Sequence, residues 1–403
     1  MNEELFNRSL YYLDILCNRI GERCVGSEGN REATRFLEKE LTAAGWQTSA
    51  TEFDAIDWRD GGARLECDGK TFEAFTGPYS LPFKGSATML AASTADELKL
   101  PEMAGKIILL HGELAREQLM PKNFVFYNPE EHQQIIRLLE NGKPAAIIGA
   151  TGRNSALAGG VYPFPLIEDG DFDIPSVYMT EEEGRRLLPH AGSKVILASE
   201  SERIPGKGYN IIAVKGRENA DRIVVSAHID AKKGTPGAID NATGVITLLL
   251  HADLLRDYDG IHQIELVAFN GEDYYAVPGQ MSYIAANQGK FSSMILDINI
   301  DGAGYQEGPS AFSEFNLPEE LLAKLMRVID GYPGITTGPQ WPQGDHSIFV
   351  QFGVPAVAVT SRWFIDNMEH QDLTHTPKDR PEITDCGKLV EIAKALNDFI
   401  RMI

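Results

Sequence analysis

The clearest hydrophobic pattern lies in the second half of the chain, where short apolar runs alternate with longer segments of helical periodicity. Continuous apolar runs of the length of buried strands occupy residues 222–227, 263–270, 293–300 and 355–359. Segments with the length and spacing of helices occupy residues 241–255, 317–329 and 387–401. Strands that alternate with helices predict an α/β sheet with helices on both of its faces.

The first fifty residues have a helical pattern instead. Apolar side chains recur at helical spacing at Leu10, Leu13, Leu16 and Ile20. A second helix is expected over about residues 31–45. One of its faces would carry Ala33, Phe36, Leu37, Leu41 and Ala44, and Gly45 suits its C-terminal cap.

The middle of the chain has a different sequence pattern, in which short apolar runs are separated by Gly, Pro and Asp. Strands are expected at residues 105–111, 145–149 and 175–178. Helices are expected at residues 129–141, followed by Gly142, and at residues 181–188. This change predicts an inserted β-rich domain over residues 56–205, within a domain formed by residues 1–55 and 206–403.

Composition narrows the class of protein. The net charge is −21, and an acidic surface argues against nucleic acid and anionic membranes as partners. The N-terminus has no apolar segment typical of a signal peptide, and no apolar run reaches the length of a membrane span. We expect a cytoplasmic enzyme, although a secreted form without its leader would look the same. Reduced, buried thiols are expected at Cys17, Cys24, Cys67 and Cys386.

Residues that bind metals follow the predicted strands of the second half. They are His228 and Asp230, Glu272 and Asp273, and Asp301, with Asp240 and His375 elsewhere in the same region. Ligands of open α/β sheets bind outside the carboxyl ends of the strands, so these side chains could converge on one crevice. Asp240 precedes a predicted helix and could instead be a plain N-cap. When Asp240 is considered together with the other candidate ligands, metal binding is the favoured interpretation of its role.

The mixture of imidazoles and carboxylates suits zinc. One histidine and one carboxylate per ion, plus one shared carboxylate, would hold two ions roughly 3.5–4 Å apart and convert a water between them to hydroxide. A further carboxylate must stay off the ions to accept the proton of that water. The adjacent Glu272 and Asp273 can divide these two tasks, and Asp230 can orient the ring of His228.

Six segments give the chain a resemblance to the co-catalytic zinc exopeptidases, the family of bacterial leucyl aminopeptidases, glutamate carboxypeptidase, glutaminyl cyclase and the transferrin receptor. They are residues 226–230, 236–244, 269–273, 299–301, 344–347 with 353–356, and 375–379. Residues 19–21 and 26–30 also resemble the opening segment of the family. The resemblance covers about residues 5–55 and 208–403.

The resemblance implies a role for each of these side chains. His228 and Asp301 would complete one zinc site, Asp273 and His375 the other, and Asp240 would bridge them. Glu272 would be the general base and Asp230 would support His228. The implied fold is a mixed, mainly parallel sheet sandwiched between helices, and the insertion resembles the protease-associated domain of many relatives.

The chain departs from the family pattern at three places. Asp273 stands where the family usually has Glu, so this ligand reaches one methylene less. The loop at residues 275–280 is one residue longer than usual. Thr374 replaces a tyrosine that donates a hydrogen bond to the oxyanion in many relatives.

We therefore expect a two-zinc aminopeptidase that acts on peptides. The pattern also allows other divalent metals in place of zinc, and it allows a homo-oligomer. A carboxypeptidase or dipeptidase would use the same metals and needs cations near the substrate carboxylate, for which Arg362 and Lys378 are candidates. A glutaminyl cyclase-like acyltransferase would hold one zinc. Asp345 and His346 could support the site or cap a helix. Ordinary structural roles are expected for the other histidines, which are His111, His132, His190, His251, His262 and His370.

Overall fold

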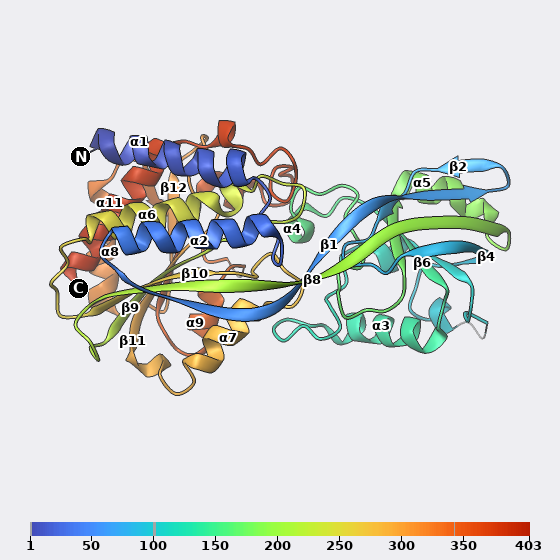
Figure 1. Ribbon diagram of the computed structural model, residues 1–403, viewed down its shortest axis with the longest axis horizontal. Helices are drawn as coiled ribbons and strands as arrows, with labels where there is room; N and C mark the ends of the chain where they lie inside the picture. Colours follow the sequence, from blue (N-terminus) through green and yellow to red (C-terminus); the bar gives the residue numbers. More distant parts are fainter. Residues whose placement is uncertain (1, 100–101, 342) are drawn as a thin grey trace. The chain divides into compact units, whose positions relative to one another are not determined.

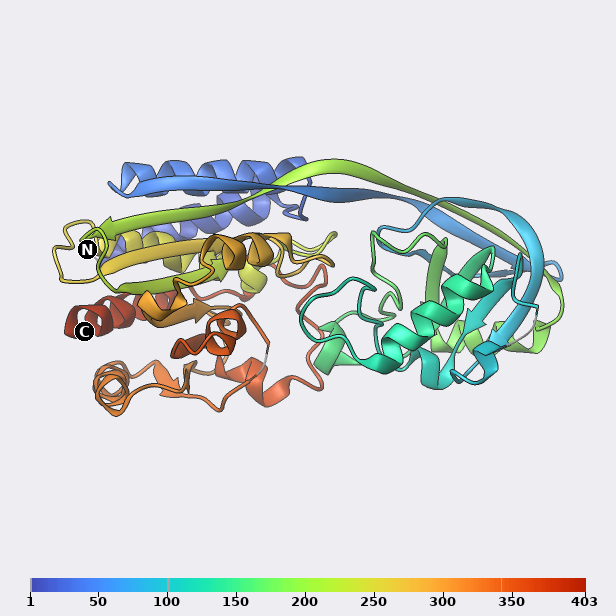
Figure 2. The same cartoon turned by 90° about the horizontal axis from the view of Figure 1, so that it is seen from below.

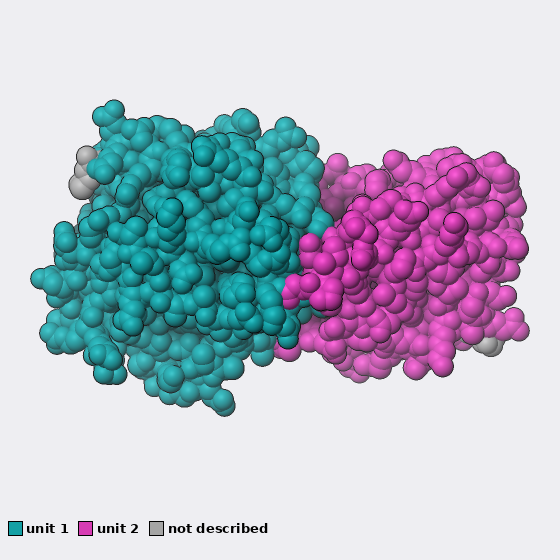
Figure 3. All heavy atoms as spheres, viewed as in Figure 1, with its two compact units in different colours: residues 1–55, 207–403 teal, residues 56–206 magenta. Residues whose placement is uncertain are grey.

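The computed structural model describes residues 2–99, 102–341 and 343–403. The chain forms two compact units, which Figure 3 shows in different colours. Unit 1 consists of Met1–Ala55 and Lys207–Ile403, and unit 2 of Ile56–Gly206. Each unit has its own hydrophobic core. No described helix has the length and apolarity needed to cross a membrane.

The sheet of unit 1 is built on four neighbouring parallel strands. In spatial order they are β10 (Gln263–Phe269), β9 (Arg222–His228), β11 (Met294–Ile300) and β14 (Ala356–Ser361). An antiparallel strand flanks them on each side. On one side β12 (Ser310–Phe315) lies beside β14, and β13 (Ile335–Thr337) runs parallel to β12. On the other side β8 (Lys194–Gly216) lies beside β10. Strand β1 (Gln47–Cys67) pairs with β8. The predicted mixed, mainly parallel sheet is confirmed.

Helices cover both faces of this sheet (Figures 1 and 2). On β9, Ile223 and Val225 point into the larger core, whereas Val224 points into the core on the opposite face. The larger core is completed by α1 (Asn2–Leu13), α2 (Glu28–Ala43), α6 (Thr243–Leu254), α8 (Glu319–Gly331) and α11 (Cys386–Met402). The opposite face is covered by α7 (Pro278–Ala286) and α9 (His346–Gln351).

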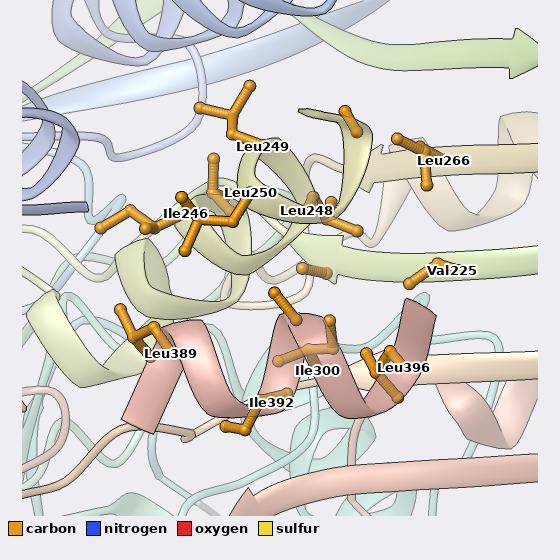
Figure 4. Packing of buried hydrophobic residues seen from close by; sticks show 14 of the residues in the cluster. Val225, Ile246, Leu248, Leu249, Leu250, Leu266, Ile300, Leu389, Ile392 and Leu396 are labelled. Carbon is orange, nitrogen blue, oxygen red and sulfur yellow. The ribbon is translucent and has the colours of Figure 1, made fainter. Parts of the chain in front are cut away.

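Helix α6 is central to the larger core. Every residue from Thr243 to Ala252 is buried, so this helix is apolar on all sides, as expected of a helix with no solvent face. Figure 4 shows α6 beside α11, which carries Leu389, Ile392 and Leu396, with Val225, Leu266 and Ile300 of the strands nearby. The helix that follows Asp240 is therefore held in place from every direction.

Unit 2 contains a second run of parallel strands. They are β4 (Phe83–Ala92), β5 (Ile107–Leu110), β6 (Ala146–Thr151) and β7 (Ser176–Thr180). Antiparallel to them are β8 beside β4 and β3 (Phe75–Thr76) beside β7, and β1 forms a hairpin with β2 (Lys70–Phe72). Its helices are α3 (Glu130–Gly142), α4 (Ser155–Ala158) and α5 (Glu181–Leu187).

Short helical turns connect these elements. They are η1 (Asp14–Ile20), η2 (Glu97–Lys99), η3 (Gly112–Ala115), η4 (Leu188–His190), η5 (Ala238–Ala242), η6 (Phe291–Ser293) and η7 (Pro381–Ile383). One further short helix, α10 (Arg362–Asn367), follows β14.

Three local details differ from the sequence pattern. Residues 47–50, at the end of the stretch with a helical pattern, begin strand β1, and Leu10, which shares the helical spacing, is 46 % exposed. Gly142 remains inside α3, and the left-handed residue at its C-terminus is Lys143, with φ of 50°. Glycine is favoured at such a position but is not obligatory, so a glycine marks the end of a helix only to within a residue.

Candidate metal centre

The predicted ligands lie at one edge of the unit 1 sheet. Strand β9 has β10 on one side and β11 on the other, so the chain order reverses at β9. Crevices form at such reversals, outside the carboxyl ends of the strands. His228 is the last residue of β9, Glu272 and Asp273 follow β10, and Asp301 follows β11 directly. The topology therefore brings together residues that are far apart in the sequence.

A first group of ligands surrounds His228. Its Nε2 atom lies 3.1 Å from an oxygen of Asp240 and 3.5 Å from an oxygen of Asp301. The His228 side chain is 1 % exposed, and Asp240 and Asp301 are 12 % and 15 % exposed. One imidazole nitrogen and two carboxylate oxygens thus face one another in a nearly buried position.

A second group shares Asp240 with the first. The other carboxylate oxygen of Asp240 lies 3.0 Å from His375 Nε2, which is also 3.0 Å from an oxygen of Asp273. In each group the potential ligand atoms lie within 4.8 Å of one another. Asp240 therefore stands between two histidines, each of which has a second carboxylate of its own.

The backbone around Asp240 rules out a plain helix cap. Asp240 and Asn241 have non-helical dihedral angles, and the α-helix begins only at Thr243. The side chain of Asn241 donates to the carbonyl of Ile300 at 2.8 Å and accepts from the amide of Gly244 at 3.0 Å. These contacts tie the Asp240 segment to the end of β11, which carries Asp301.

His375 has an unusual backbone conformation. Its φ of 63° lies in the left-handed region that non-glycine residues rarely adopt. Such residues cluster at functional sites, where the surrounding structure holds them in place. The conformation is therefore consistent with a backbone held so that the His375 ring lies at the site.

Asp230 supports the loop after β10. Its carboxylate accepts hydrogen bonds from the amides of Gly271 at 2.8 Å, Glu272 at 3.3 Å and Asp273 at 3.0 Å. The Nδ1 atom of His228 lies 3.2 Å from the carbonyl oxygen of Asp230 and 3.6 Å from its carboxylate. The expected support of His228 is thus shared with a second task, which is to position Glu272 and Asp273.

Asp379 has a matching task that the sequence did not reveal. Its carboxylate accepts from the amides of Ile239 at 2.7 Å and Asp240 at 3.0 Å, and so holds the shared ligand in place. Burial, with the nearby Asp240, raises the pKa of Asp379 to about 7. The position of Asp379 in the segment after His375 was the one signal available in the sequence.

Arg23 holds the same region from the opening segment of the chain. This fully buried guanidinium donates to the carbonyls of Ile229, Pro236 and Gly237 at 2.7–3.0 Å. These carbonyls flank His228 and Asp240 in the sequence. Its role also follows only from the three-dimensional structure.

The electrostatics of the site are dominated by the carboxylates. Burial alone would lower the pKa of His228, but Asp301, Asp230 and Asp240 outweigh it and raise that pKa well above its ordinary value. Burial is likewise outweighed at His375 by Asp273 and Asp240, which raise its pKa. Burial would raise the pKa of Asp240, but the two histidines lower it. The buried carboxylates thus strongly stabilise a positive charge placed between them.

Glu272 lies beside the ligands in a group with His228 and Asp273. Burial, together with the charges of Asp273 and Asp301, raises its pKa well above the ordinary value for a glutamate. A carboxylate with a raised pKa is a better proton acceptor near neutral pH than an ordinary one. Glu272 therefore has the environment expected of a general base.

The donor set fits zinc. Imidazole nitrogen and carboxylate oxygen are both zinc ligands. Among the described residues, the buried His228 Nε2 and Asp273 Oδ2 atoms have no hydrogen-bond partner. A buried polar atom without a partner costs free energy, and a metal ion would satisfy both atoms. The geometry thus suits ligands around an ion better than a hydrogen-bonded cluster.

Asp345 stands at the N-cap position of α9, but its side chain does not cap the helix. It precedes α9 without a capping hydrogen bond, and its carboxylate accepts from Gln280 Nε2 at 3.0 Å. Burial raises the pKa of Asp345 to about 7. His346 is buried beside Trp341 and Phe315, with Nε2 3.0 Å from the Trp341 carbonyl. Of the two expectations for this segment, the structure contradicts the cap.

The other candidates have partners of their own. Arg362 Nε lies 2.9 Å from a carboxylate oxygen of Asp366, and Lys378 pairs with Asp372. The hydroxyl of Thr374 accepts a hydrogen bond from Gln371 at 2.8 Å. The four cysteines are free and buried.

Comparison with known proteins agrees with this geometry. Residues 210–400 match the model of Peptidase family M28. The chain is 25% identical over 283 residues to a probable lipoprotein aminopeptidase, LpqL, of Mycobacterium tuberculosis, a match that covers 67% of this chain and 52% of the relative. The chain thus spans about half the length of this curated relative. The resemblance to the co-catalytic zinc exopeptidases is confirmed.

Solved structures show the same fold. A zinc aminopeptidase from Bacillus subtilis superposes with a TM-score of 0.77 and 18% identity, covering 98% of this chain and 95% of that one. An aminopeptidase from Aneurinibacillus sp. strain AM-1 superposes with a TM-score of 0.76 and 18% identity, covering 100% and 93%. At this level of identity the likeness establishes the fold.

Proposed function

We propose that this chain, whose residues 210–400 match Peptidase family M28, is a two-zinc aminopeptidase that removes N-terminal residues from peptides. The observation that carries the proposal is Asp240, whose two oxygens lie 3.1 Å and 3.0 Å from the Nε2 atoms of His228 and His375. A carboxylate between two histidines, each with its own second carboxylate, is the arrangement that a pair of ions requires.

His228, Asp240 and Asp301 would hold one ion, and Asp240, Asp273 and His375 the other. Zinc bound there would polarise the scissile carbonyl and lower the pKa of a water at the site. Other divalent metals that accept imidazole and carboxylate ligands could also be bound.

Glu272 would move the proton. It would accept the proton of the attacking water and deliver it to the nitrogen of the leaving amine. Asp230 keeps the Glu272 and Asp273 backbone in position through its three amide hydrogen bonds. Burial raises the pKa of Glu272, which makes its carboxylate a stronger proton acceptor.

Cleavage from the N-terminus is favoured by the charges around the site. Carboxylates surround it, and they would attract a free α-amine. A carboxypeptidase needs a cation for the substrate carboxylate, but both candidates for this task, Arg362 and Lys378, are paired with nearby aspartates. The proposal extends to unit 2, which we interpret as an insertion like the protease-associated domain.

The test is mass spectrometry of a mixed peptide pool incubated with the zinc-loaded full chain. Stepwise loss of N-terminal residues is expected. Glu272→Gln should retain its zinc and lose activity by about 10²–10⁴-fold, because it keeps the ligands but cannot accept a proton. Loss of residues from the C-terminus, or substantial activity in Glu272→Gln, would overturn the proposal.

A further inference from the structure

A second group of metal-binding side chains lies in unit 2. Cys67, the last residue of β1, and Asp68, in the turn to β2, face His190 at the end of η4. Their potential ligand atoms all lie within 4.8 Å of one another. His190 Nδ1 lies 2.7 Å from a carboxylate oxygen of Asp68, across 122 positions of sequence. None of the three residues belongs to the unit 1 centre.

The three side chains differ in accessibility in a way that suits an ion. Cys67 is 2% exposed and belongs to the core of unit 2. The side chains of Asp68 and His190 are 52% and 16% exposed. A buried thiol thus lies below a partly exposed imidazole and carboxylate, which leaves a path for an ion from solvent.

The donor chemistry is selective. Thiolate, imidazole and carboxylate together suit zinc, whereas magnesium and calcium prefer oxygen ligands alone. Ligands about 2.0–2.3 Å from a tetrahedral zinc ion lie about 3.3–3.8 Å from one another, so His190 Nδ1 and the Asp68 oxygen, now 2.7 Å apart, would have to separate slightly to admit the ion. The exposed side chains of Asp68 and His190 can make this adjustment by rotation.

An ordinary ion pair explains only part of this arrangement. The His190–Asp68 contact and the 3.3 Å hydrogen bond from Ser193 to Asp68 are typical of a protein surface. The thiol of Cys67 contributes to neither of these contacts, and it donates a weak hydrogen bond to the carbonyl of Lys194 at 3.7 Å. A thiol held beside an imidazole and a carboxylate is the additional feature that calls for a ligand.

We propose that Cys67, Asp68 and His190 form a zinc site in unit 2, separate from the centre in unit 1. Binding would release the thiol proton of Cys67, because the thiolate is the form that binds metals. Three protein ligands leave a fourth position for water or for a donor atom of another molecule. The ion would join the β1–β2 turn to η4 and so stabilise unit 2 by linkage.

Cadmium reports on this site because a thiolate bound to Cd²⁺ absorbs in the ultraviolet, whereas imidazole and carboxylate ligands do not give this band. The full chain is stripped of metal with a chelator and titrated with Cd²⁺. One equivalent of the thiolate band is expected in the wild type and in Cys386→Ser, a control at a buried cysteine of unit 1. The band should be absent in Cys67→Ser.

A second variant guards against misfolding of Cys67→Ser. His190→Gln changes a partly exposed side chain and should weaken Cd²⁺ binding about tenfold or more, since one of three ligands is lost. A wild type without the band, a band that persists in Cys67→Ser, or unchanged affinity in His190→Gln would overturn the proposal. These outcomes are independent of peptidase activity, so they are distinct from failure of the proposed function.

Discussion

At the scale of single residues, the site depends on carboxylates that touch no substrate. Asp230 and Asp379 each accept amide hydrogen bonds from the segments that carry Glu272, Asp273 and Asp240. A carboxylate accepts only, so it can face several N–H donors at once without conflict. Both side chains are fully buried, so their hydrogen bonds are not exchanged with water.

Asp230→Asn should therefore be costly. The new amide group would place an N–H donor against one of the amides of residues 271–273, which leaves a buried donor without a partner. We expect a loss of about 1.5–3 kcal/mol in the free energy of unfolding, together with a lower kcat because Glu272 is no longer held in place. Urea unfolding and steady-state kinetics measure the two effects.

Asp345→Asn is the matched control for this variant. Asp345 is also a buried carboxyl group of unit 1, but the hydrogen bond recorded for its carboxylate comes from the flexible side chain of Gln280, which can turn to suit an amide. A loss of stability in Asp345→Asn as large as that in Asp230→Asn would contradict the explanation based on the three backbone amides.

Five side chains of the candidate centre could be singled out because they follow apolar strands, whereas the roles proposed for Asp240 and His375 depended on the family resemblance. Asp379 and Arg23 could not be assigned a role, because their partners are backbone groups. Asp379 contacts the amide of Asp240, which is 139 positions away in the sequence. Nothing in the residue types of the two segments indicates that register.

At the scale of elements, a fully buried histidine lies where α6 packs against α11. His251 of α6 is fully buried, and its Nδ1 atom lies 3.4 Å from the carbonyl of Ala393 in α11. Burial lowers the pKa of His251 to about 4. The helix pair therefore keeps this ring neutral at physiological pH.

This histidine should make the fold sensitive to acid. The unfolded chain binds a proton at His251 below about pH 6.5, whereas the folded chain resists it until about pH 4. The stabilising contribution is thus complete above the unfolded pKa and is lost as the pH falls towards 4. Between pH 7 and pH 4.5 it amounts to about 2–3 kcal/mol.

His251→Leu should remove this part of the pH dependence. Leucine fills much of the same space, and the polar contact that it removes from the ring is the long 3.4 Å contact of Nδ1 with the Ala393 carbonyl. Urea unfolding at pH 7 and pH 4.5 should show that the variant loses about 2–3 kcal/mol less than the wild type. Equal losses in the two proteins would refute a neutral buried histidine.

The elements could be predicted where burial is complete and not where it is partial. Strands β9, β10 and β11 are buried almost throughout, so their apolar runs were visible in the sequence. Most residues of β1 are exposed or half-buried, so its hydrophobic pattern is weak. Such a strand is specified by its pairing with β8, which sequence periodicity does not reveal.

At the scale of the whole molecule, charge should influence which peptides arrive fastest. The net charge of −21 attracts cationic substrates over a distance of about 10 Å at moderate salt. We expect kcat/KM for a lysine-rich peptide to fall as salt rises from low to physiological concentration. Steady-state assays at several salt concentrations measure the effect.

A neutral peptide of the same length and the same N-terminal residue is the control for this experiment. Its kcat/KM should change little, because its chemistry at the site is the same and only the long-range attraction is absent. A parallel fall for both peptides would indicate that salt acts on the metal centre or on the fold rather than on encounter.

The division of unit 1 into two segments has a consequence for biosynthesis. Helices α1 and α2 pack in the same core as α6 and α11, which the ribosome makes only after all of unit 2. At about 5–20 residues per second, residues 207–403 take about 10–40 s to synthesise. Until α6 and α11 have been made, the nascent chain exposes the apolar faces of its first two helices, which lack most of their core. Those two helices are where a chaperone would be needed during translation.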